Sequence, residues 1–285
     1  MNQTIFLWKV DQATNLLSPV DLPNEIKTLD DVAVALPQGG YTTFRVYPPA
    51  KVLNLDAHFS RLEETAKLLN QSVTLDKQLL RHCLREIIAQ SPFQNVRIRI
   101  SIDLATPSQT IYIGLEEVNL PSVENYIEGV DLVTHIGVRN NPKAKATEFI
   151  QHAQRIKKEA RNHNKVFHEI LLVDPDGYIY EGLSSNFYAI KKDTLWTAND
   201  GVLSGTTRTI LLSLVQQASI PLVLEPVNIK DIPQVTEAFI TSVSRGVLPV
   251  RRIEHYVIGP GIPGPITLKI SDLYKSYIAQ AIEDI

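Results

Sequence analysis

The segment that most constrains the fold lies near the middle of the chain. Two runs of apolar and aromatic residues, 170–173 and 178–180, flank Asp174-Pro175-Asp176-Gly177. Proline presets the backbone for a turn, and glycine tolerates the positive φ that a tight turn needs. The pattern predicts an antiparallel hairpin, which puts β-structure in the second half of the chain.

Patterning elsewhere predicts strands mixed with helices. The part up to residue 55 is strand-like and broken by turn residues, and the segment from Val96 to Ile102 alternates with period two. A helix is predicted after Asp56, which can cap it, because Phe59 and Leu62 begin an apolar stripe at helical spacing. Predicted strands are 41–47, 96–102, 110–115, 186–190 and 238–243, and further helices are predicted at 79–88, after 204–207 and from 266.

The chain is long enough for two modest domains. Its 285 residues are near twice the ~150 residues of a common domain. Residues 119–129 are polar, contain a proline and show no periodicity, which is typical of a linker. We therefore expect an α+β fold with a small N-terminal domain at 1–119, a linker at 120–128 and a larger C-terminal domain at 129–285.

Composition and charge exclude several kinds of partner. Twenty-eight Lys and Arg oppose 31 Asp and Glu, and no basic block could follow a phosphate backbone, so nucleic acid is not expected as a partner. The N-terminal residues lack the basic and apolar regions of a signal peptide, and no run approaches the ~18 apolar residues of a membrane span. The sequence predicts a cytoplasmic protein with no membrane partner.

Metal and nucleotide motifs are absent from the sequence. Cys83 is the single cysteine, which rules out an intrachain disulfide or a thiolate cluster and fits a reducing compartment. Seven histidines include no H-x-x-x-H pair, and neither G-x-G-x-x-G nor G-x-x-x-x-G-K-[ST] occurs. We expect no metal site, and the Rossmann and P-loop classes lack support.

A specific resemblance appears directly after the predicted hairpin. Glu181-Gly182-Leu183-Ser184-Ser185-Asn186 resembles the E-G-x-[ST]-x-N signature of class IV, or fold type IV, pyridoxal-phosphate aminotransferases. Asp56-x-His58-x-x-Arg61-Leu62, Ser204-Gly205-Thr206-Thr207-Arg208 and Ser242-x-x-Arg245-Gly246 match in the family's order. The resemblance runs from about residue 40 to 274. It implies a two-domain fold-type-IV enzyme with pyridoxal 5′-phosphate at the domain interface and a homodimer or higher homo-oligomer.

The resemblance also implies a lysine that holds the cofactor as a Schiff base. Lys145, in Asn141-Pro142-Lys143-Ala144-Lys145-Ala146, fits this position near the start of the second domain, and Lys143 is the alternative. Such a lysine can act twice, first as the imine partner and then, once substrate displaces it, as the base for the α-proton. Without the resemblance, Lys145 would be read as a solvated loop lysine.

Further cofactor contacts follow from the same resemblance. Glu181 would face the pyridine nitrogen and keep the ring protonated, and Arg61 would bind the phosphate. The threonines of the predicted helix start would offer backbone N–H groups to the phosphate, although such residues are more often simple caps. Val243 stands where the family usually has a threonine. The implied cofactor residues are Arg61, Lys145, Glu181, Ser185, Asn186, Gly205, Thr206, Thr207, Ser242 and Val243.

Substrate contacts implied by the resemblance involve an aromatic residue and several arginines. Arg97 and Arg99 share one face of a predicted strand and could contact the substrate carboxylate, or they could be exposed strand arginines. Ile150 stands where branched-chain enzymes often have a tyrosine, and Ser244-Arg245-Gly246 is unlike their T-A-E run. The predicted substrate-binding residues are Tyr41, Arg97, Arg99, Ser244 and Arg245.

The function implied is transamination between a small α-amino acid, possibly branched-chain, and a 2-oxo acid. Two alternatives on the same scaffold stay open. One is aminodeoxychorismate lyase, which eliminates pyruvate and forms 4-aminobenzoate, and the other is D-amino-acid aminotransferase. A non-enzymatic descendant that uses the fold as a binding module is disfavoured, because packing alone does not require the lysine, carboxylate, arginine and threonine set.

Overall fold

The computed structural model describes residues 4–162 and 167–285. The prediction that the N-terminal residues lack the features of a signal peptide falls partly on residues 1–3, which lie outside the described residues. The chain divides into two compact units. The first contains 1–119, 143–154 and 281–285, and the second contains 120–142 and 155–280. The long helix α5 (Glu148–Asn162) contributes residues to both. The sequence-based division differs, because it placed 143–154 and 281–285 in the C-terminal domain.

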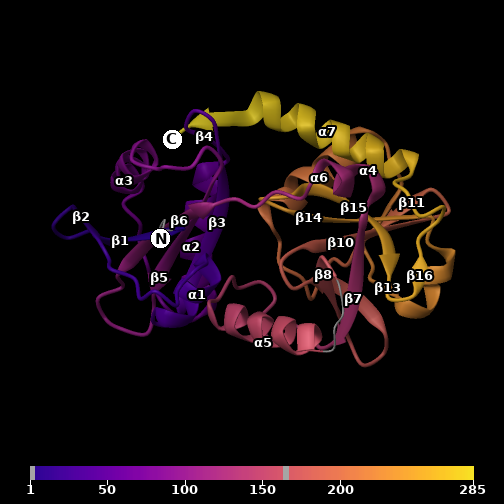
Figure 1. Ribbon diagram of the computed structural model, residues 1–285, viewed down its shortest axis with the longest axis horizontal. Coiled ribbons are helices and arrows are strands. Elements are labelled where there is room, and N and C mark those ends of the chain that lie inside the picture. Colours follow the sequence, from indigo (N-terminus) through magenta and orange to yellow (C-terminus); the bar gives the residue numbers. More distant parts are fainter. Residues whose placement is uncertain (1–3, 163–166) are drawn as a thin grey trace. The chain divides into compact units, whose positions relative to one another are not determined.

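The first unit is built on an antiparallel sheet. Its strand order is β17-β4-β3-β5-β6-β1-β2. Figure 1 shows α2 alongside β3, and the two elements are in contact. The strands are β1 (Ile5–Asp11), β2 (Leu16–Pro19), β3 (Gly39–Tyr47), β4 (Lys51–Leu53), β5 (Val96–Asp103), β6 (Ile111–Glu117) and β17 (Ile282–Asp284), and the helices are α1 (Leu29–Ala35), α2 (Leu55–Leu68) and α3 (Lys77–Ala89).

The starts of two helices in this unit, α1 and α2, differ from what the sequence predicted. The predicted cap at Asp56 is wrong, because α2 starts at Leu55 behind Asn54, whose φ of 51° breaks the preceding strand geometry. Asp56 lies in the first turn and accepts a hydrogen bond from Arg81 instead. The short α1 was not predicted, although Thr28 and Asp31 form a capping box at its start.

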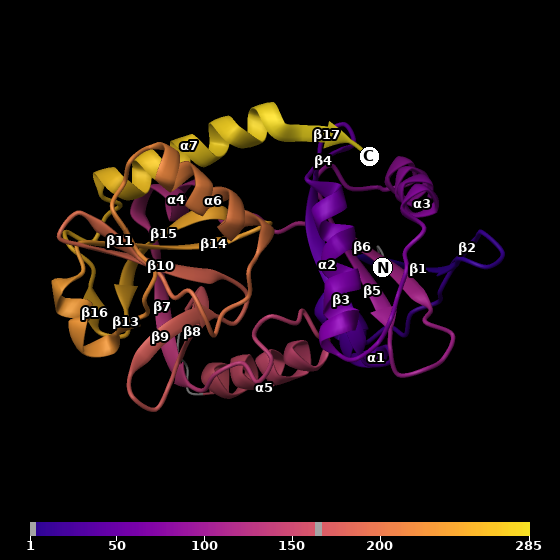
Figure 2. The ribbon, with the colours of Figure 1, turned by 180° about the vertical axis from the view of Figure 1, so that it is seen from behind.

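The second unit is built on a larger mixed sheet. Its strand order is β12-β11-β10-β14-β15-β7-β8-β9-β13, with β16 paired to β15. Figures 1 and 2 show α6 and α7 along one side of this sheet. The elements are α4 (Val123–Glu128), β7 (Val130–Ile136), β8 (Glu169–Val173), β9 (Tyr178–Gly182), β10 (Asn186–Lys191), β11 (Thr194–Trp196), α6 (Thr206–Gln217), β12 (Leu222–Val223), β13 (Val227–Asn228), η1 (Ile229–Gln234), β14 (Glu237–Ser242), β15 (Gly246–Ile253), β16 (Tyr256–Val257) and α7 (Pro265–Ala281).

The predicted central hairpin is confirmed. Strands β8 and β9 pair antiparallel, and Gly177 adopts a φ of 90° between them. Asp174 closes the turn by accepting hydrogen bonds from the backbone N–H groups of Asp176 and Tyr178. The segment proposed as a linker is more ordered than expected, because Ser122 and Asn125 form a capping box that starts α4.

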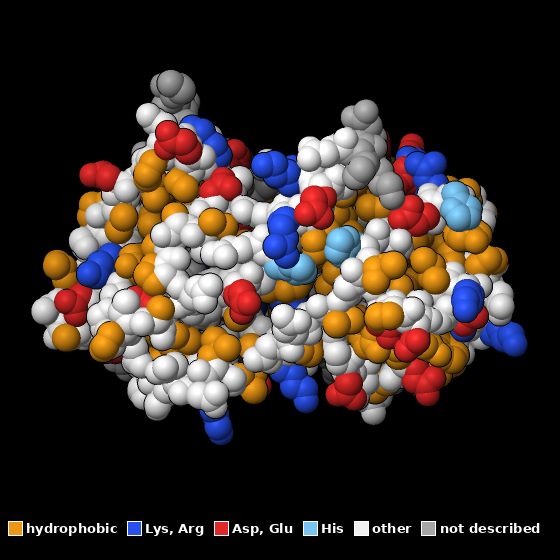
Figure 3. Space-filling model, turned by 90° about the horizontal axis from the view of Figure 1, so that it is seen from below, with side chains coloured by type: hydrophobic (Ala, Val, Ile, Leu, Met, Phe, Trp, Pro, Cys, Tyr) orange, Lys and Arg blue, Asp and Glu red, His pale blue; other side chains and the backbone are white. Residues whose placement is uncertain are grey.

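The surface carries no dominant charge on the face drawn in Figure 3, where basic and acidic side chains are interspersed. Among the described residues, none of the helices has the length and apolar character that crossing a membrane requires. Within the same residues, no group of three or more His, Cys, Asp or Glu side chains could hold a metal ion.

Candidate functional site

The backbone of Lys145 is fixed by pairing with the start of β3. The N–H of Tyr41 donates to the carbonyl of Lys145 at 2.9 Å, and Gly40 forms an isolated β-bridge with Ala146. The N–H of Lys145 donates to Thr65 Oγ1 on α2 at 3.3 Å. These contacts explain why Lys145, expected in the second domain, groups with the first unit.

Gly39 at the start of β3 lies between β5 and the segment that follows Lys145. A Cβ at Gly39 would lie 1.8 Å from the carbonyl oxygen of Ile102 on β5. The Gly39 N–H donates to Thr147 Oγ1 at 2.9 Å, and its carbonyl accepts from the Thr147 N–H at 2.8 Å. Gly39 therefore meets the segment after Lys145 through Thr147 and lies so close to β5 that a Cβ has no room there.

The Lys145 side chain points to an aromatic face. Its Nζ lies 5.1 Å from the centroid of the Tyr41 ring, and the side chain is half-buried, whereas Lys143 is exposed. Tyr41 packs in a small apolar cluster with Ala33 and Ile150, so the isoleucine found in place of a tyrosine supports the ring. Lys145 therefore has the more enclosed side chain of the two candidate lysines, and its role as the reactive lysine stays a prediction.

Helix α2, which belongs to the first unit, carries the cation Arg61 and the buried imidazole of His58. Burial lowers the pKa of the half-buried Arg61 guanidinium, and Glu64, 3.9 Å away, partly offsets that effect. Burial, together with the positive charges of Lys145 and Arg61, lowers the pKa of His58 to about 3. The sequence motif contained His58, but we assigned it no role. Its Nδ1 lies 2.8 Å from Thr42 Oγ1, and the imidazole is neutral at ordinary pH.

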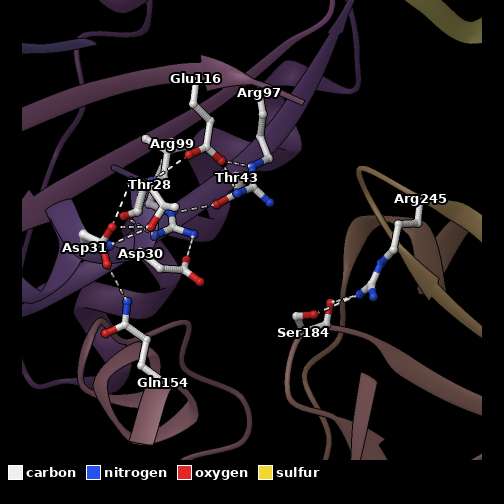
Figure 4. A network of polar contacts seen from close by, with 11 residues as sticks. Thr28, Asp30, Asp31, Thr43, Arg97, Arg99, Glu116, Gln154, Ser184 and Arg245 are labelled. Carbon is white, nitrogen blue, oxygen red and sulfur yellow. Dashed lines mark hydrogen bonds and ion pairs between the residues drawn. The ribbon is translucent and has the colours of Figure 1, made fainter. Parts of the chain in front are cut away.

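The two strand arginines are engaged within the first unit, as Figure 4 shows. Arg97 Nε donates to Glu116 Oε1 at 2.6 Å. Arg99 is buried and donates to Thr43 Oγ1 at 3.1 Å, to the Leu29 carbonyl at 2.7 Å and to Asp30 Oδ1 at 2.7 Å. They therefore tie β5 to β3, β6 and α1. Their contact with a substrate carboxylate stays a prediction.

Glu181 is a buried carboxylate in the second unit. Its Oε1 accepts from Arg139 Nε at 2.9 Å, and its Oε2 accepts from the Leu203 N–H at 3.0 Å. Asn186 Nδ2 bridges Glu181 Oε2 at 3.4 Å and the Leu203 carbonyl at 2.9 Å, which assigns Asn186 a supporting contact. The sequence motif contained no sign of Arg139, because it lies 42 residues before Glu181.

A second buried carboxylate, Glu169, organises the neighbouring loops. Ser185 Oγ donates to its Oε2 at 3.2 Å, and Arg245 donates to the same oxygen at 3.0 Å. Burial would raise the pKa of Glu169, but the charges of Arg245 and Lys157 and hydrogen bonds from Ser184 outweigh it, so the pKa lies below its ordinary value. The feature of the sequence that could have drawn attention to Glu169 is its position directly before the apolar run 170–173, at the start of β8.

Arg245 joins the two loops that hold these residues. Its guanidinium donates to Ser184 Oγ at 2.9 Å, drawn in Figure 4, and to Ser242 Oγ at 2.9 Å. Val243 and Ser244 lie half-buried in the turn between β14 and β15. The hydrogen bonds of Arg245 thus link the loop of Ser184 to the turn of Ser242. The substrate role expected for Arg245 and Ser244 stays a prediction.

The start of α6 offers backbone donors. Gly205 is the N-cap, and no described side chain caps the helix at this end. The Thr207 hydroxyl accepts from Tyr274 at 3.3 Å, and Thr206 is half-buried. Arg208 is buried behind the first turn and donates to Thr197 Oγ1 and to the Ala198 carbonyl. The first N–H groups of a helix lack intrahelical acceptors, and together with the helix dipole they favour an anion here.

The residue types present fit pyridoxal phosphate. Lys145 supplies an amine with a fixed backbone, and Glu181 supplies a buried carboxylate that Arg139 and the Leu203 N–H hold in place. The start of α6 and Arg61 supply donors and charge suited to a phosphate dianion. Glu181, Ser185, Asn186, Gly205, Thr206, Thr207, Ser242 and Val243 lie in the second unit, and Arg61 and Lys145 lie in the first.

Comparison with known proteins points to a single family. The family model described as Amino-transferase class IV matches residues 39–253. The chain is 28% identical over 256 residues to Branched-chain-amino-acid aminotransferase-like protein 2 of Arabidopsis thaliana, a match covering 84% of this chain and 45% of that protein. It is 24% identical over 265 residues to D-alanine aminotransferase of Bacillus licheniformis, covering 88% and 91% respectively. The chain spans about half the length of the Arabidopsis relatives that it matches.

Solved structures share the architecture. The branched-chain amino acid aminotransferase of Escherichia coli matches with a TM-score of 0.79 at 20% identity, over 100% of this chain and 97% of that one. Another branched-chain amino acid aminotransferase, solved with pyridoxamine 5′-phosphate, matches with a TM-score of 0.80 at 18% identity, over 100% and 99% respectively. At these identities the likeness shows the fold alone. It confirms the predicted mixed α and β architecture of the fold-type-IV class.

Proposed function

Because the chain belongs to the class IV aminotransferase family, we propose that it is a pyridoxal-phosphate-dependent aminotransferase. It would move the amino group of a small α-amino acid to a 2-oxo acid. The observation that carries the proposal is the placement of Lys145, which is held by Tyr41 and Thr65 and is half-buried, while Lys143 is exposed. These contacts fix the backbone from which the Lys145 amine extends.

The chain's own groups have separable tasks. Pyridoxal phosphate, when bound, supplies an electron-withdrawing ring that stabilises negative charge at the substrate α-carbon. Lys145 Nζ would hold the cofactor covalently and, once displaced by the substrate amine, accept the α-proton. Glu181 would accept a hydrogen bond from the ring nitrogen, with Arg139 and the Leu203 N–H holding its carboxylate in place. The start of α6 and Arg61 would bind the phosphate.

The substrate side chain is proposed to be small and uncharged. The support is the packing of the apolar side chains of Ala33 and Ile150 with Tyr41, whose ring the Lys145 side chain contacts. The relatives named above are branched-chain and D-alanine aminotransferases at similar identity, so both enantiomers belong in the test. The predicted residues Arg97, Arg99, Ser244 and Arg245 stay candidates for the substrate carboxylate.

Absorption spectroscopy tests the proposal. The purified protein with pyridoxal phosphate is mixed with L-amino acids, D-amino acids or aminodeoxychorismate in separate cuvettes. We expect a visible band that one amino-acid set converts to the shorter-wavelength band of the aminated cofactor, and that a 2-oxo acid restores. Pyruvate release from aminodeoxychorismate without this cycle would favour the lyase. A protein that forms no band would be a binding relative.

We also propose a homodimer or higher homo-oligomer in the cytoplasm. The family resemblance supports the assembly, and the single buried cysteine suits a reducing compartment. Sedimentation of the cofactor-loaded protein measures the assembly, and a mass of 31.9 kDa at all concentrations would contradict it.

A further inference from the structure

One aromatic ring in the first unit contacts two cations. The Tyr41 ring centroid lies 5.1 Å from Lys145 Nζ and 4.9 Å from Arg99 Cζ. Both distances are within the ~6 Å over which a cation is attracted to the negative face of an aromatic ring. Lys145 is half-buried and Arg99 is buried, so water weakens these attractions less than it would at an exposed site.

The ring is held firmly enough to set the position of a neighbour. Tyr41 is buried, pairs with Ser101 in the β3–β5 ladder and donates its N–H to the Lys145 carbonyl. Arg99 beside it is anchored to Asp30 and to the Leu29 carbonyl. The backbone of Lys145 and the ring that its side chain contacts are therefore parts of one rigid arrangement.

Charged and titratable groups surround this lysine on the neighbouring elements. Arg99 on β5 lies against the same ring and is paired with Asp30 of α1. On α2, Arg61 is close to Glu64, and both Arg61 and Lys145 act on His58. His58 is neutral at ordinary pH, so it adds no positive charge beside Lys145. The Tyr41 ring is also neutral, and its negative face attracts a protonated amine.

We propose that Tyr41 is a positioning residue for Lys145, whose protonated amine it holds against the ring face by a cation–π contact. The ring thereby sets the pH at which Lys145 becomes a free base. This inference rests on the proposed function and deepens it, because the amine must be neutral to attach the cofactor and protonated after it accepts the α-proton. The phenol hydroxyl has no part in this role.

Graded fluorination of the ring isolates the contact. Fluorine atoms withdraw electron density from the ring face and weaken a cation–π contact with little change in shape. The full-length chain is made with Phe, 4-fluoro-Phe, 3,5-difluoro-Phe or 3,4,5-trifluoro-Phe at position 41, and thermal unfolding checks that each folds. Lys145 of the cofactor-free protein is then acetylated across a pH series, and peptide mass spectrometry gives the midpoint of its reactivity.

We expect Tyr41→Phe to leave the Lys145 midpoint unchanged, since the ring remains. Each added fluorine should lower the midpoint, by a total of a few tenths to about one pH unit. Lys143, exposed and two residues away, is the internal control and should not move. A Lys145 midpoint that ignores fluorination, or that moves together with Lys143, overturns the inference.

The outcome separates this inference from the proposed function. If fluorination has no effect while Lys145→Ala abolishes covalent cofactor attachment, the aminotransferase proposal stands and the role of the ring fails. If Lys145→Ala leaves attachment intact, the proposed function fails whatever the midpoints show. The loaded enzyme gives a further check, because fluorination should change the pH profile of kcat more than it changes KM.

Discussion

At the scale of single residues, the second unit contains buried glutamates that do different work. Glu181 is held by Arg139 and a backbone N–H, and Glu237 caps α7 by accepting from the N–H groups of Ile266 and Thr267 at 3.1 and 2.6 Å. Both are nearly fully buried. Equal burial therefore does not imply equal function, and substitution can tell the two apart.

Glu181→Gln is predicted to keep the cofactor and lose turnover. The neutral amide would no longer favour a protonated ring nitrogen, and kcat should fall by roughly 10²-fold. Glu237→Gln is the matched control, which should lower the melting temperature while kcat stays within a factor of about two. Steady-state kinetics and thermal unfolding of both variants make the comparison. Near-normal turnover of Glu181→Gln would remove this residue from the mechanism.

Arg245→Met is predicted to destabilise the fold at neutral pH. It would leave the Glu169 carboxylate buried without its arginine, a change that costs about 3 kcal/mol. The pKa of Glu169 in the native protein is depressed, so its contribution is present above the ordinary value of 4.5 and is lost as pH falls below it. In Arg245→Met the stability should recover on acidification instead. Urea unfolding from pH 4 to 8 tests this, and parallel profiles for both proteins would contradict it.

His58→Asn is predicted to flatten the acid limb of the stability profile. The folded pKa of about 3 lies below the ordinary 6.5, so the unfolded chain binds a proton first as pH falls. Stability contributed by the neutral imidazole is therefore full above 6.5 and is lost between 6.5 and 3, by about 1.4 kcal/mol per pH unit. Asn keeps an acceptor for Thr42 but does not titrate. Urea unfolding between pH 4 and 7 should show a shallower slope, and an unchanged slope would refute the assignment.

At the scale of elements, the sequence predicted best where the signal was local. Period-two alternation located β5, and the Asp-Pro-Asp-Gly turn located the β8–β9 hairpin, because both patterns are complete within a few residues. Helix α4 was missed because it is only six residues long, so the apolar residues Val123, Tyr126 and Ile127 complete no more than one turn of helical spacing. The pairing of Gly39 with Thr147 joins residues 108 apart, so no local pattern could show it.

Gly39→Ala is predicted to disrupt the strand edge that holds Lys145. The new methyl would lie 1.8 Å from the Ile102 carbonyl oxygen, so β3 and β5 must separate, at a cost of about 3 kcal/mol. The control is Gly137→Ala, where the nearest atom would be 3.4 Å away. Urea unfolding should show a large loss for the first variant and a change under about 0.5 kcal/mol for the second. If Gly39→Ala loses no more unfolding free energy than Gly137→Ala, the close approach of Gly39 to Ile102 does not matter for stability.

At the scale of the whole chain, the two units are not contiguous in sequence. The motifs predicted site roles for Glu181, Asn186 and the start of α6, each of which lies in an unbroken stretch of the second unit. The role of Lys145 was predicted from family resemblance, but its return to the first unit depends on long-range contacts with Tyr41 and Thr65. Domain boundaries drawn as continuous stretches of sequence cannot anticipate that residues 143–154 group again with the first unit after 120–142 of the second.

The most direct test of the account is the location of the covalent cofactor attachment. The protein is loaded with pyridoxal phosphate, reduced with borohydride to make the attachment permanent, digested and analysed by mass spectrometry. The account predicts the pyridoxyl mass on Lys145, with attachment lost in Lys145→Ala and kept in Lys143→Ala. The added mass on Lys143, or on neither lysine, would contradict the catalytic assignment.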